Sequence, residues 1–197
     1  MAVDRKHGVG RALDILNIYG RLGYDVIGLQ ETRRSGHSAF NQAGYSVYCS
    51  GECRGENGGK KEQGGVGLAI RTFITRAARP PEFISDRLLK VTLELRGRAK
   101  AVTFFVAYAP IKTQNASNKH AFWTSLDRAV EKVPRDEQLF VLMDANTRTG
   151  RRGKGQVGSK DTLNDNGELL LSYAKNHDLA LVNTFYTTPK GGVHTFK

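Results

Sequence analysis

An acid and an amide directly follow a run of apolar residues in the second half of the chain. Leu139 to Met143 are apolar, and Asp144, Ala145 and Asn146 come next. Such a run predicts a strand buried on both faces. Polar side chains at the end of a buried strand lie where α/β sheets usually bind ligands, because the sheet fixes them and the next loop gives access. Asp144 and Asn146 are therefore candidates for chemistry, although both residue types also serve as turn or N-cap residues.

Other predicted elements carry polar or aromatic residues at their ends in the same way. Asp25 to Leu29, for example, is a short apolar run that leads into an amide, an acid and a hydroxyl. In chain order, the segments are Gln30-Glu31-Thr32, Tyr108-Ala109-Pro110, Asp144-Ala145-Asn146, Asn166-Gly167, Val182-Asn183-Thr184 and Thr195-Phe196. Each segment alone is a weak signal, whereas the six in this order and strand context are specific.

This ordered set resembles that of the endonuclease/exonuclease/phosphatase superfamily and, within it, the apurinic-type endonuclease domain of non-LTR retrotransposons. The resemblance extends from Leu13 to Phe196. It implies an α/β (α+β) fold, a four-layer sandwich of two mixed sheets flanked by helices, with the active site where strand ends of both sheets converge. The implied activity is nicking of DNA phosphodiester bonds with Mg²⁺, and Mn²⁺ is the alternative ion.

The resemblance also assigns roles to individual residues. It implies that Glu31 binds the metal, that Tyr108 points at the scissile phosphate, that Asp144 activates the attacking water and that Asn146 holds that water and a phosphate oxygen. Two alternatives stay open from the residues alone: Glu31 as a turn acid paired with a neighbouring arginine, and Tyr108 as a core tyrosine. The expected phosphate or DNA contacts are Asn183, Thr195, Arg148, Arg151, Arg152 and Lys154.

Two departures from the family pattern bear on activity. Met1 to Gly8 is too short and polar to supply the family's first strand and its asparagine, and the chain stops at Lys197, before the family's aspartate and terminal Ser-Asp-His. We therefore expect a partial domain, incomplete at its N- and C-terminal strands, whose exposed sheet edges promote self-association. The rival interpretation is a non-catalytic remnant that binds nucleic acid through its basic surface. A third is a domain completed by a second polypeptide or a swapped copy.

Composition is consistent with a nucleic-acid partner. At 197 residues we expect one domain over residues 1–197, and a formal net charge of +11 favours a polyanion such as DNA. Cys49 and Cys53 are too few for a disulfide framework, which suggests reduced thiols. Neither a signal peptide nor an apolar span of membrane length is recognisable, so we expect an intracellular protein, nuclear or cytoplasmic, without a membrane partner.

The periodicity predicts the elements that position these residues. Helices are expected from residue 9 to about 20, from Ser117 (as N-cap) to about 133, and from about 166 to 177. Strands at 65–70, 89–95 and 101–109 should pair antiparallel in succession, with Gly97 in a hairpin turn. The remaining predicted strands are 25–29, an edge strand at 45–50, 139–143, a buried strand at 179–184, and 193–196.

Overall fold

The computed structural model describes residues 9–52, 64–95, 97, 100–111, 113–147, 163–182 and 185. The chain divides into two compact units. Unit 1 comprises Met1–Tyr108 and Arg128–Asp144, and unit 2 comprises Ala109–Asp127 and Ala145–Lys197. That residues 1–197 form a single domain stays a prediction.

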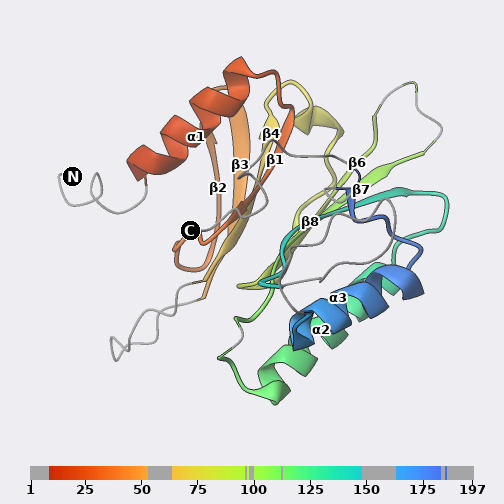
Figure 1. Ribbon diagram of the computed structural model, residues 1–197. Helices are drawn as coiled ribbons and strands as arrows, with labels where there is room; N and C mark the ends of the chain where they lie inside the picture. The colour runs from red at the N-terminus through yellow and green to blue at the C-terminus, as the bar shows by residue number, and fades with distance from the viewer. Residues whose placement is uncertain are drawn as a thin grey trace. The chain divides into compact units, whose positions relative to one another are not determined.

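The first sheet of unit 1, sheet A, is antiparallel in all its described pairings (Figure 1). Its strand order is β1-β4-β3-β2. Helix α1 (Val9–Arg21) packs against it through Leu16, which is fully buried among apolar side chains that include Ile27 and Tyr45. The strands are β1 (Val26–Gln30), β2 (His37–Gln42), β3 (Tyr45–Ser50) and β4 (Val66–Arg71).

The prediction that Tyr45–Ser50 is an edge strand is wrong, because β2 pairs with its outer side. Ala43 and Gly44, with φ of 50° and 77°, form the turn of this hairpin, and two positive φ values in succession match the twist of paired strands. Strand β2 was not predicted because its sequence is mostly polar. Its side chains alternate between exposed and half-buried, so it carries little apolar signal.

The second sheet, sheet B, is mixed. Its order is β5-β6-β7-β8, with antiparallel pairing up to β7 and parallel pairing between β7 and β8. Gly97 lies between β6 and β7 with φ of 79°, in agreement with the predicted turn. The strands are β5 (Glu82–Ser85), β6 (Leu88–Leu93), β7 (Val102–Tyr108) and β8 (Gln138–Asp144).

Two further strand predictions need correction. The three successive strands do not pair in succession, because β4 belongs to sheet A whereas β6 and β7 belong to sheet B. Strand β8 is not buried on both faces: it is half-buried, with Phe140 exposed, and it lies at one of the two edges of the described sheet B. An apolar run indicates that a strand contacts a core, but it specifies neither the strand's neighbours nor its position in the sheet.

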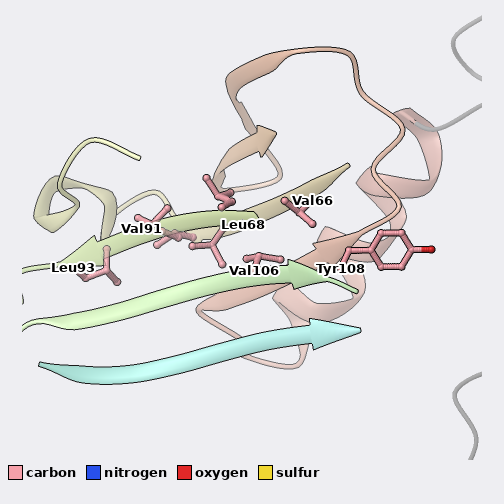
Figure 2. Close-up of a cluster of buried hydrophobic side chains, with 8 residues drawn as sticks. Val66, Leu68, Val91, Leu93, Val106 and Tyr108 are labelled. Carbon is pink, nitrogen blue, oxygen red and sulfur yellow. The ribbon is translucent and has the colours of Figure 1, made fainter. Parts of the chain in front are cut away.

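The core of unit 1 lies between the two sheets. Side chains from β4, β6 and β7 pack together there. Figure 2 shows Tyr108 at one end of this cluster and Leu93 at the other. The buried members are Val66, Leu68, Ile70, Leu89, Val91, Leu93, Val106 and Tyr108. The predicted α+β class, with two sheets and helices, is confirmed.

Two helices define unit 2: α2 (Ala116–Glu131), whose last residues belong to unit 1, and α3 (Asp165–Asn176). Asn115, rather than the predicted Ser117, caps α2, since its Oδ1 accepts from the Asn118 amide at 2.8 Å. Trp123 and Tyr173 bring the helices together, with ring centroids 5.6 Å apart.

After α3, the predicted buried strand at 179–184 is not found in its described part. Residues 179–181 belong to no strand, and Val182 is 58% exposed. The predicted strand at 193–196 lies outside the described residues. No helix in the part of the chain that the structure describes is long and apolar enough to cross a membrane.

A polar network at the start of β7 yields a prediction about stability. The Glu137 carboxylate accepts from Thr103 Oγ1 at 2.5 Å and pairs with Arg79 at 3.1 Å, and its side chain is only 6% exposed. Glu137→Ala should therefore cost about 1–3 kcal/mol, because the buried Thr103 hydroxyl loses a charged acceptor and keeps Thr92 Oγ1, 2.7 Å away, as a partner. Glu94→Ala is the matched control, since Glu94 pairs with the same arginine but is 60% exposed, and it should cost under about 1 kcal/mol. Equal urea midpoints for the two variants would contradict this ranking.

Candidate functional site

Glu31 lies in a strained loop that begins where β1 ends. Glu31 and Arg33 both have left-handed backbones, with φ of 55° and 52°, a conformation that costs about 1–2 kcal/mol for residues of these types. Backbone bonds from the Thr32 and Arg33 amides to the carbonyls of Gly65 and Gly64, at 3.1 and 3.0 Å, hold the loop. Such strain at a predicted metal ligand is consistent with a site that fixes its carboxylate in advance.

Two glycines let other segments approach this loop. A Cβ on Gly51 would lie 1.8 Å from the carbonyl oxygen of Arg34, and a Cβ on Gly65 would lie 2.4 Å from Thr32 Oγ1. The Gly51 amide also donates to the Gly36 carbonyl at 2.9 Å. The position of Glu31 therefore depends on residues that a search for acids and amides does not select.

This packing predicts that Gly51→Ala destabilises unit 1 by about 1–3 kcal/mol, because the new methyl group must displace backbone rather than a flexible side chain. Gly20→Ala, near the end of α1, is the matched control: its Cβ would meet Tyr45 at an ordinary 3.5 Å. It should be neutral or stabilise by up to about 0.5–1 kcal/mol, since alanine favours helix. Urea unfolding measures both. A Gly51→Ala variant as stable as the Gly20→Ala variant would contradict the close approach.

The Glu31 carboxylate is held from two sides. The Tyr108 hydroxyl donates to Glu31 Oε1 at 2.8 Å, and Arg33 lies 3.6 Å from Oε2. Arg87 lies over the Tyr108 ring, 5.2 Å from its centroid. The contacts that the two structural alternatives require are therefore both present. Glu31 pairs with an arginine, and Tyr108 is buried with its hydroxyl in a hydrogen bond. The partner of that hydroxyl is, however, the predicted metal ligand.

Asp144 ends β8 beside Tyr108, because the parallel register of β7 and β8 pairs these two residues. The Gln30 side chain donates to the Leu142 carbonyl at 3.1 Å and so links the end of β1 to β8. The two sheets approach closely here, since a Cβ on Gly28 would lie 2.8 Å from Leu142 Cβ. Unit 1 therefore brings the ends of the strands that carry Glu31, Tyr108 and Asp144 together.

Asn146 belongs to unit 2. Its backbone is left-handed, with φ of 46°, a conformation that asparagine tolerates better than most residues. Its side-chain amide donates to the Ala109 carbonyl at 2.8 Å. A second amide, Asn166, donates to the Pro110 carbonyl at 2.8 Å. Asn166 was not among the predicted site residues, although Asn166-Gly167 was one of the six ordered segments.

The remaining predicted contacts lie outside the described residues, so the structure says nothing of their positions. They are Asn183, Thr195, Arg148, Arg151, Arg152 and Lys154.

Glu31 suits a hard divalent cation. Mg²⁺ takes oxygen ligands, keeps several waters and shares itself between one or two carboxylates and a substrate phosphate, so it does not need a cage of protein ligands. Among the described residues no group of three or more His, Cys, Asp or Glu side chains could hold a metal. Glu31 could supply one carboxylate to such a sparse site. The cation would compete with the partly exposed Arg33 guanidinium for Oε2, while Tyr108 holds Oε1. Cys49 is free and buried, and burial raises its thiol pKa, which makes it an unsuitable ligand.

The sequence matches one family model and two curated proteins. The sequence model of the Endonuclease/Exonuclease/phosphatase family matches residues 5–155. Craniofacial development protein 2 of Bos taurus is 21% identical over 182 residues, which cover 89% of this chain and 29% of that protein. The same protein of Tragulus javanicus is also 21% identical, over 89% of this chain and 30% of its own length. The chain thus spans less than a third of these curated relatives.

Two solved structures share the fold. The AP endonuclease LMAP from Leishmania major has a TM-score of 0.56 at 13% identity, over 82% of this chain and 60% of that one. The endonuclease domain of TRAS1, a telomere-specific non-LTR retrotransposon, has a TM-score of 0.53 at 14% identity, over 84% of this chain and 64% of that one. At these identities the likeness concerns the fold.

Proposed function

This chain belongs to the endonuclease/exonuclease/phosphatase family, and we propose that it is a metal-dependent phosphodiesterase that nicks DNA, as the endonuclease domain of a non-LTR retrotransposon. The observation that carries the proposal is the hydrogen bond from Tyr108 to Glu31, with Asp144 in register beside Tyr108. These residues lie at or just after the ends of three strands from both sheets. A purely structural explanation does not require an acid, a phenol and a second acid at one place.

Each side chain has a distinct task in this proposal. Glu31 would hold Mg²⁺, and the bound ion would offset charge on the phosphate oxygens. Asp144 would orient the attacking water and accept its proton. The Tyr108 hydroxyl donates to the Glu31 carboxylate and holds it in place. As a donor beside that carboxylate, the same hydroxyl would stabilise negative charge on the phosphate. Asn146 would hold the water and a phosphate oxygen through its amide.

DNA is the proposed substrate. The net charge of +11 attracts a polyanion, and the two similar structures are an AP endonuclease and a retrotransposon endonuclease domain. We propose that the loop with Arg148, Arg151, Arg152 and Lys154 contributes phosphate contacts, together with Asn183 and Thr195, and that the protein acts inside the cell.

The proposal is tested by incubating the purified chain with supercoiled plasmid and Mg²⁺ or Mn²⁺, beside a sample with EDTA. Conversion to open circles that EDTA prevents supports the nuclease. The rival function is charge-driven binding without cleavage. It predicts intact plasmid in every sample, with DNA affinity that falls steeply as salt rises.

We also propose self-association through sheet edges. Strand β2 is the outermost described strand on its side of sheet A, and such edges offer unpaired backbone groups to another chain. Light scattering over a range of concentrations tests this, and a constant monomer mass would contradict it.

A further inference from the structure

We propose that Asn166 is a positioning residue that sets the orientation of Asn146. Its side-chain nitrogen donates to the Pro110 carbonyl at 2.8 Å and, over a longer 3.4 Å, to the Asn146 carbonyl. An amide nitrogen has two protons, so one is available for each carbonyl. The kinetic part of this inference rests on the proposed function.

The two asparagines tie two loops of unit 2 together. Asn146 reaches back to the Ala109 carbonyl, and Asn166 holds the next carbonyl, that of Pro110. Ala109 and Pro110 directly follow Tyr108, and Asn146 comes two residues after Asp144. The residues that continue from the ends of β7 and β8 are thus fastened by a pair of side-chain amides instead of by continued strand pairing.

The bond from Asn166 acts on Asn146 at the point where its backbone departs from ordinary geometry. A left-handed backbone costs free energy and persists where the surrounding structure holds it, so an added bond to the Asn146 carbonyl helps to maintain this conformation. Because the carbonyl and the side chain of Asn146 are both held, by Asn166 and by Ala109 respectively, the amide plane of Asn146 has a defined direction.

Burial of Asn166 supports a positioning role over a merely structural one. The residue is 2% exposed, and its Oδ1 atom is buried with no hydrogen-bond partner among the residues that the structure describes. Turning the amide around would place that oxygen against two carbonyls, so the observed orientation is the better one. A buried oxygen without a donor costs free energy that an apolar residue of similar size would avoid. The hydrogen bonds from its side-chain nitrogen to the Pro110 and Asn146 carbonyls explain why an asparagine occupies this position.

The test compares Asn166→Leu with Asn164→Ala. Asn166→Leu keeps the number and branching of the side-chain heavy atoms, adds the bulk of two methyl groups and removes both donors. Asn164 caps the same helix, with its side chain accepting from the Gly167 amide at 2.8 Å, so Asn164→Ala weakens α3 without removing the bonds to Pro110 and Asn146. Each variant of the full chain is measured for urea unfolding, for kcat and KM of DNA nicking, and for the side-chain amide resonances of Asn146 by NMR.

We expect both variants to lose stability, but only Asn166→Leu to lower kcat, by about 10–100-fold with KM within about threefold, since a misplaced group acts mainly on the reaction step. The Asn146 amide resonances should shift in Asn166→Leu and stay in place in Asn164→Ala. Equal kcat values for wild type and Asn166→Leu, or an equal fall in both variants, would overturn the inference.

A second variant and a second measurement cover the cases in which Asn166→Leu does not fold or the wild-type chain does not cleave DNA. If Asn166→Leu does not fold, Asn166→Gln retains the donors on a longer side chain, and the same shift in Asn146 resonances and fall in kcat are expected from their displacement. If the wild-type chain does not cleave DNA, the proposed function fails, and the resonances alone decide: unchanged Asn146 signals in the Asn166 variants would then refute the positioning role.

Discussion

Asp144→Asn is expected to lower the rate constant for DNA cleavage by about 10²–10⁴-fold, the usual contribution of a general base. The substitution keeps size and shape but removes the negative charge that accepts the proton of the attacking water. Asp144 is half-buried at the end of β8, where it pairs in register with Tyr108. This pairing is made by the backbone, so a change of side chain leaves it in place. The loss should therefore fall on the rate and not on folding.

Single-turnover cleavage of a short labelled duplex measures this effect. Asp136→Asn is the matched control, because Asp136 is an exposed acid just before the other end of the same strand. It removes one negative charge without touching the site, and its rate should match that of wild type. Equal rates for the Asp144→Asn and Asp136→Asn variants would exclude Asp144 as the base.

Leu89→Ala should be among the most destabilising single changes, at about 2–5 kcal/mol. Leu89 lies on β6 in the cluster between the sheets and is fully buried, so truncation leaves a cavity that the close packing of two sheets fills poorly. Leu22→Ala provides the control, since Leu22 is 66% exposed and should change stability by under about 0.5 kcal/mol.

Urea unfolding followed by fluorescence and circular dichroism gives both values. Coincident transitions by the two probes would justify treating the unfolding as two-state. A cost below about 1 kcal/mol for Leu89→Ala would mean that the inter-sheet cluster contributes less than its burial indicates.

The residues of unit 1 that carry the proposal could be found from the sequence because each follows an apolar strand. Glu31, Tyr108 and Asp144 end such runs, and pairing of the strands brings Tyr108 and Asp144 into register. Strand ends are visible in a sequence since burial of the strand selects apolar residues up to the point where the chain becomes accessible.

The neighbours that position these residues could not be predicted in the same way. Gly51 lies beside the loop of Glu31 because of a backbone approach that has no sequence pattern of its own. Asn166 stood in a recognised segment, but only the folded chain shows that its donors reach Pro110 and Asn146. Strand β2 was missed because a half-exposed strand of polar residues resembles a loop. Long-range pairing, rather than local preference, decides all three.

Plasmid nicking at graded Mg²⁺ concentrations, by wild type and by Glu31→Gln, tests most directly whether Glu31 supports metal-dependent cleavage of DNA. The amide keeps an oxygen for Tyr108 but loses the charge that attracts the cation. We predict that wild-type nicking rises to saturation with Mg²⁺, and that Glu31→Gln needs at least about tenfold more Mg²⁺ or does not nick at all. Nicking that persists in EDTA, or the same Mg²⁺ dependence in both proteins, would contradict this role of Glu31.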